Sequence, residues 1–126
     1  MKPSFIHPTA ANSSDDPSPL STDQVASWQT QGYTLVDGLF PASVVNELQT
    51  AASAHFPAAG SEQAASIRDF GSAVNFPSQL AGFNQLTLHP RLLGAVSQLL
   101  GCDVSGLRLS QSDLWPKYGR ASTDGH

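Results

Sequence analysis

The chain has 126 residues, of which 40% are hydrophobic and 13% charged, and its formal net charge is −4. This length allows one domain with a core of its own, whereas six Lys and Arg residues in all are too few for a basic surface that binds nucleic acid. No apolar run approaches the ~18 residues of a membrane span, and the N-terminus lacks the apolar segment of a secretory signal. The sequence therefore predicts a cytoplasmic protein without nucleic-acid or membrane partners.

Residues 1–20 contain four prolines and four serines. Such a segment has no apolar periodicity and cannot offset the entropy cost of ordering, so we predict a flexible leader. Order is expected to begin at Ser21, because Ser21 and Gln24 fit a capping box in which each side chain bonds the backbone N–H of the other. Gly32 supplies a left-handed stop. The pattern predicts a helix between these two ends.

A short strand is predicted next, at residues 33–36, where the β-formers Tyr, Thr, Leu and Val stand before an Asp-Gly turn pair. Residues 42–56 carry apolar side chains at helical spacing and predict an amphipathic helix that Pro57 ends. The stretch 58–77 has no clear periodicity and predicts no element.

The most regular helical pattern follows Pro90, which suits the first helical position because its missing N–H would be unpaired there. Apolar residues then recur at three- and four-residue steps up to Gly101: Leu92, Leu93, Val96, Leu99 and Leu100. Cys102 is the single cysteine, so it excludes an intramolecular disulfide, and its place after the helix predicts a reduced, buried side chain. A thiol enzyme using Cys102 and His89 would need a third orienting group, which the sequence does not show.

Residues 107–115 predict a strand with one face that begins apolar and then turns polar. The side chains of that face are Leu107, Leu109, Gln111, Asp113 and Trp115. Two interpretations fit the pattern: a strand that runs from a packed core into a solvated pocket, and an edge strand with one wet face.

The predicted capped helix leads into the motif Gln31-Gly-Tyr-Thr-Leu-Val-Asp-Gly-Leu-Phe40, and a second block runs from Leu86 through His89-Pro90 to Leu100-Gly101 and the strand. In this order, the elements resemble the N-terminal region of the phytanoyl-CoA dioxygenase family. The resemblance covers residues 21–119 and leaves 120–126 as a polar tail. It implies an α+β fold, consisting of a helical outer layer and the first strands of a double-stranded β-helix (jelly-roll) that is incomplete in this chain.

The resemblance implies iron(II)- and 2-oxoglutarate-dependent oxygenase chemistry for a full-length parent. In that family a His-x-Asp pair and a distal His bind the iron and leave open positions for 2-oxoglutarate and oxygen. The histidines before the C-terminus do not match the pair, because His7, His55 and His89 are followed two residues later by Thr9, Pro57 and Arg91. His126 is the last residue and stands where a His-x-Asp motif could begin. We therefore assign no catalytic or metal-binding residue, and expect no cofactor on this chain alone.

By position in the family, Gln111 and Asp113 would line the pocket of the parent and Lys117 would stand at its mouth; the alternative is that they are ordinary exposed residues at a strand end. Two functions remain open. The chain is the N-terminal part of an oxygenase acting on a small molecule or acyl thioester, or it is a non-catalytic interaction module derived from that family. In either case, an exposed apolar surface would favour self-association.

Overall fold

The computed structural model describes residues 18–68 and 71–119. Its helices are α1 (Thr22–Gln31), α2 (Ala42–His55), α3 (Glu62–Ser66), α4 (Ala81–Thr87) and α5 (Pro90–Leu100), with a short 3₁₀ helix at Val104–Gly106. Strands β1 (Val74–Asn75) and β2 (Asp113–Leu114) pair antiparallel, with Val74 opposite Leu114 and Asn75 opposite Asp113. Most of the predicted leader, the polar tail and His126 lie outside the described residues.

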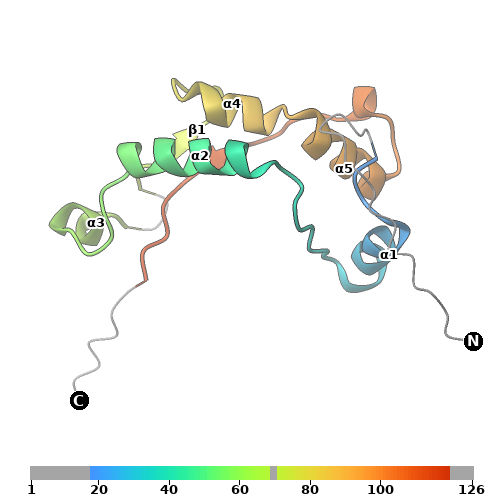
Figure 1. Cartoon of the computed structure of the whole chain (residues 1–126), viewed down its shortest axis with the longest axis horizontal. Helices are drawn as coiled ribbons and strands as arrows, with labels where there is room; N and C mark the ends of the chain where they lie inside the picture. Colours follow the sequence, from blue (N-terminus) through green and yellow to red (C-terminus); the bar gives the residue numbers. More distant parts are fainter. Residues whose placement is uncertain (1–17, 69–70, 120–126) are drawn as a thin grey trace, which may run out of the picture.

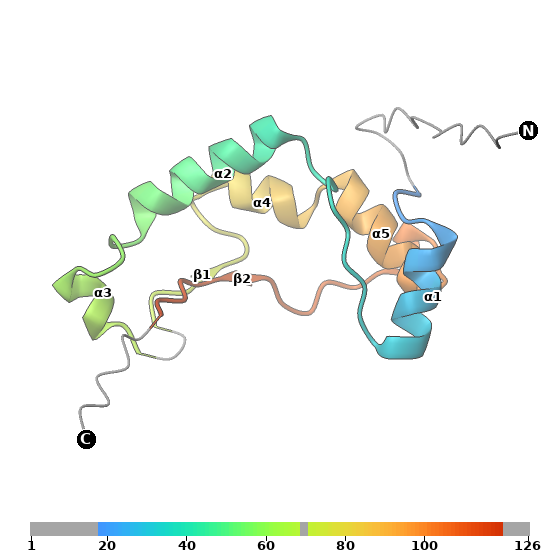
Figure 2. The same cartoon turned by 60° about the horizontal axis from the view of Figure 1, so that its bottom comes forward.

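The elements form an open arc rather than closed layers (Figures 1 and 2). Helix α3 lies at one end of the arc, α2 and α4 pack side by side in the middle, and α5 packs against α1 at the other end. The predicted α+β class is confirmed by these helices and the small two-stranded sheet. The jelly-roll architecture stays a prediction, because the sheet described here has too few strands to test it.

Helix α1 begins and ends as its sequence predicts. The Ser21 hydroxyl accepts from the Gln24 backbone N–H at 3.2 Å, and the Gln24 side chain accepts from the Ser21 N–H at 2.9 Å. This reciprocal pair satisfies two backbone donors that the first helical turn leaves unpaired. At the other end, Gly32 has a φ of 81° and donates its N–H to the Trp28 carbonyl, and that left-handed geometry favours glycine.

Helix α5 holds the backbone of Leu20, which we predicted to belong to the flexible leader. The Leu20 N–H donates to Oε1 of Gln98 at 2.8 Å, and Nε2 of Gln98 donates to the Leu20 carbonyl at 3.0 Å. The Leu20 side chain is only 6% exposed. An amide side chain in α5 therefore supplies both partners that the Leu20 backbone would otherwise find in water.

The strand predicted at residues 33–36 is wrong in the described structure, where this segment pairs with no strand. Its carbonyls instead accept from side chains of α1: Ser27 Oγ donates to Tyr33 O, and Gln24 Nε2 donates to Leu35 O, both at 3.2 Å. The predicted strand at 107–115 is likewise reduced to Asp113–Leu114, the part that lies opposite β1. Extended sequence alone does not make a strand when the neighbouring strand is missing.

The core of the described residues is small. Its buried apolar residues are Leu20, Ala64 and Ala95, and no large side chain is fully buried in this part of the chain. The guanidinium of Arg91 is also buried, at 3% exposure, and its Nε donates to the Leu39 carbonyl at 2.6 Å. Cys102 is exposed, so its predicted burial is wrong. None of the described helices has both the length and the apolar character that crossing a membrane would require.

Candidate functional site

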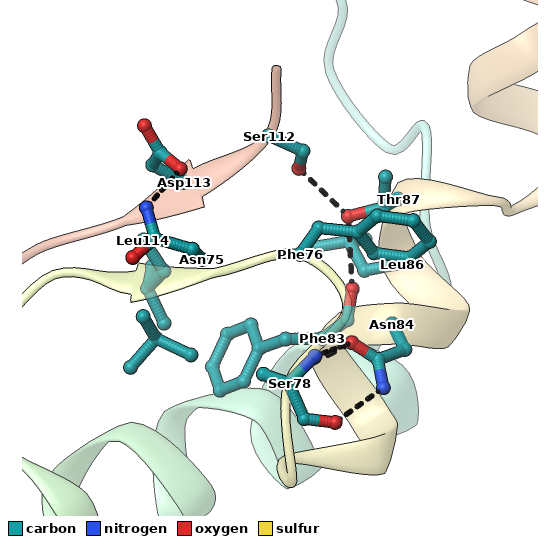
Figure 3. A pocket seen from close by; sticks show the side chains of 11 residues that line it. Asn75, Phe76, Ser78, Phe83, Asn84, Leu86, Thr87, Ser112, Asp113 and Leu114 are labelled. Carbon is teal, nitrogen blue, oxygen red and sulfur yellow. Dashed lines mark hydrogen bonds between the residues drawn. The ribbon is translucent and has the colours of Figure 1, made fainter. Parts of the chain in front are cut away.

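A small pocket lies where β1, β2 and α4 meet (Figure 3). It is lined by the polar residues Asn75, Ser78, Asn84, Thr87, Ser112 and Asp113 and by the apolar residues Val74, Phe76, Phe83, Leu86 and Leu114. Its volume of about 80 Å³ is well below the ~300–1,000 Å³ of typical small-molecule pockets. As described, the pocket has room for a few water molecules.

The carboxylate of Asp113 is oriented by two neutral amides. Asn75, its partner across the sheet, donates from Nδ2 to Oδ1 of Asp113 at 2.7 Å, and the Gln111 side-chain amide donates to the other oxygen, Oδ2. Each carboxylate oxygen therefore has a donor, and neither bond involves a cation. The arrangement fixes the direction of the side chain while leaving the remaining lone pairs of Asp113 available as acceptors.

A pair of hydroxyl groups connects α4 to the segment before β2. Thr87 Oγ1 lies 2.8 Å from Ser112 Oγ, and it also lies 3.0 Å from the Phe83 carbonyl (Figure 3). Because the Thr87 hydroxyl has one proton and the carbonyl can only accept, Ser112 donates to Thr87 when Thr87 donates to Phe83. The Ser112 carbonyl in turn accepts from the Phe76 N–H at 2.9 Å. Ser112 thus joins α4 and β1 along one side of the pocket.

The chain enters α4 through a reciprocal amide contact. The Asn84 side chain accepts from the Ser78 N–H at 2.8 Å and donates to the Ser78 carbonyl at 2.7 Å. This contact satisfies the backbone of Ser78 much as a paired strand would. It holds the connection between β1 and α4, and so fixes the opposite side of the pocket.

The three residues predicted from the sequence have different positions. Asp113 lines the pocket. Gln111 is exposed and reaches the pocket only through its bond to Asp113. The Lys117 ammonium lies 4.7 Å from the centre of the Trp115 ring, a cation–π distance. Neither Gln111 nor Lys117 is among the described residues that line the pocket.

Sequence analysis missed Asn75, Thr87 and Ser112. Asn75 lies in the stretch for which no element was predicted, and its role depends on a partner 38 residues away in the sequence. Thr87 and Ser112 are 25 residues apart and make their contact only through the fold. A polar residue at a helix end and a serine in an extended segment carry no local signal that distinguishes them from solvated side chains.

Within residues 18–68 and 71–119, no group of three or more His, Cys, Asp and Glu side chains is placed to hold a metal ion. We derive no catalytic step through iron for these residues. No protein-family model, curated protein or solved structure matches the chain.

Proposed function

We propose that this chain is the N-terminal part of an iron(II)- and 2-oxoglutarate-dependent oxygenase of the phytanoyl-CoA dioxygenase type, to which it contributes the outer helical layer and the first strands. The order of motifs from Ser21 to Gly119 suggests the family. The structural observation that carries the proposal is the uncovered apolar surface of the helical layer.

That surface is clearest on α5. Its regular stripe would be buried in a closed domain, but Leu92, Val96 and Leu99 are only half-buried and Leu100 is 60% exposed. Full burial of one leucine side chain stabilises the folded state by about 1.5–3 kcal/mol. Several half-buried side chains together therefore leave several kcal/mol of this stabilisation unrealised. A helix layer gains this energy when it packs on a sheet, and further strands of a jelly-roll would supply that sheet.

In such a parent, the segment ending at β2 would lead towards the substrate. Asp113 is the residue best suited to contact it, because Gln111 and Asn75 fix its carboxylate and leave it acceptor capacity. The pocket described above would be one edge of a larger cavity completed by later strands. Iron(II) and 2-oxoglutarate would be held by those later residues, and the substrate would be a small molecule.

The proposal is tested by reading the coding sequence beyond the codon for His126 and expressing the protein it encodes. Continuation into a His-x-Asp pair and a distal His, with succinate released from 2-oxoglutarate on addition of iron(II), would support it. A stop codon directly after His126 would instead favour the non-catalytic interaction module. A longer protein that lacks the triad would also contradict the oxygenase assignment.

A further inference from the structure

His89 lies in the short connection between α4 and α5, which is called the joint below. Its backbone N–H donates to the Leu86 carbonyl of α4 at 3.1 Å, and its carbonyl accepts from the Leu93 N–H of α5 at 3.0 Å. Its side chain is the N-cap of α5, because Nδ1 accepts from the Arg91 backbone N–H at 3.2 Å. The half-buried imidazole meets the Phe40 ring edge to face, with the ring centres 4.9 Å apart.

We propose that His89 is a pH-sensitive joint that caps α5 when its imidazole is neutral and releases the first turn of α5 when it is protonated. The cap requires a lone pair on Nδ1, so the neutral ring must carry its proton on Nε2. An imidazolium has N–H groups at both positions and accepts no hydrogen bond. Serine, threonine, asparagine and aspartate caps lack this property near neutral pH.

Two sources of positive charge lie close to the imidazole of His89. A helix N-terminus carries partial positive charge from its unpaired N–H groups, and the buried guanidinium of Arg91 lies in the first turn of α5. Both add positive charge beside the ring, and neither can replace the hydrogen bond that the Nδ1 lone pair accepts.

Few other ionisable groups belong to the elements around His89. Helix α4 has no charged residue, and α5 has only Arg91. The connection from α1 to α2 carries Tyr33 and Asp37, and no ion pair joins Asp37 to His89 in the described part of the chain. The Phe40 ring would favour a cation only if the imidazolium lay over its face, which makes it the contact that opposes the proposal.

The joint also bears on the pocket. Thr87, two residues before His89, is the α4 residue that bonds Ser112 beside Asp113. A looser connection between α4 and α5 would leave α4 held by its packing on α2, by the Asn84–Ser78 contact and by this hydroxyl pair. Protonation of His89 would then change the mobility of one wall of the pocket.

The test compares the wild-type chain with His89→Asn and His55→Asn. Asparagine caps a helix at any pH, and His55 is an exposed histidine at the end of α2, which makes it the matched control. The main measurement is the solvent-exchange rate of the Arg91 amide by NMR, corrected for the intrinsic pH dependence of exchange. Between pH 7.5 and 5.5, we expect protection to fall about fivefold in wild type and His55→Asn, as loss of one cap implies, and to stay constant in His89→Asn.

Far-UV circular dichroism of the three proteins gives a second measurement that does not need resolved spectra. Wild type and His55→Asn should lose helical signal over the same pH interval, and His89→Asn should not. An equal loss in all three proteins would overturn the proposal, as would a wild-type chain whose Arg91 protection and helical signal are both independent of pH.

Discussion

Replacing Gln98 with alanine should release the segment around Leu20 from α5. The substitution removes two hydrogen bonds to the Leu20 backbone, of 2.8 and 3.0 Å, and each such bond contributes about 1 kcal/mol net. A loss of about 2 kcal/mol corresponds to a roughly 30-fold larger population of the released state. The Leu20 side chain, buried at 6% exposure, would still favour docking, so the segment should open more often without detaching completely.

The assay is limited proteolysis with chymotrypsin, which cleaves after leucine. When opening is fast relative to cleavage, the cleavage rate after Leu20 follows the population of the open state, so Gln98→Ala should be cut roughly 30 times faster than wild type. Gln98→Glu keeps an acceptor for the Leu20 N–H but loses the donor, and it should be intermediate. Gln85→Ala is the control, because Gln85 is exposed on α4. Equal rates for Gln98→Ala and wild type would refute this account of how Leu20 is held.

Three further outcomes are expected. The isolated chain should bind a hydrophobic dye and self-associate. The double variant Leu35→Gln/Leu100→Gln should reduce both effects, since the two leucines are 80% and 60% exposed. A monomer that unfolds cooperatively above about 60 °C would contradict this prediction. Anaerobic titration should show no micromolar iron(II) binding and no succinate release, whereas stoichiometric binding with turnover would mean that the motif pattern was misinterpreted. Asn75→Ala should speed hydrogen exchange of the Phe76 amide about fivefold, because it removes a hydrogen bond between the two strands. Asn46→Ala, at an exposed position of α2, is the control and should leave this exchange rate unchanged.

Helices α1 and α5 were predictable because their signals are local, whereas α3 lies in the stretch for which no element was predicted. The capping box of Ser21 and Gln24 and the left-handed Gly32 lie within or beside the helix they delimit. Pro90 and Gly101 likewise stand at the two ends of α5. Each of these residues acts on backbone groups at most four positions away, so its effect is visible in the sequence.

The strands and the buried Leu20 were less predictable because their partners are distant. The 33–36 segment has the side chains of a strand, but the described residues bring no strand beside it. The strand pairs among the described residues join positions about 40 apart in the sequence, as in Asn75 with Asp113. Of the pocket, sequence reasoning named Asp113 through the family resemblance, while its partners Asn75 and Ser112 depend on that pairing.

Three contacts between a side chain and a distant backbone join segments that are far apart in the sequence. They join Gln98 to Leu20, Tyr118 to Pro57 and Arg91 to Leu39, over 78, 61 and 52 residues. Helices form within about a microsecond from local contacts, whereas each of these closures must also overcome the entropy of a long loop. They should therefore form last during folding and open first on warming.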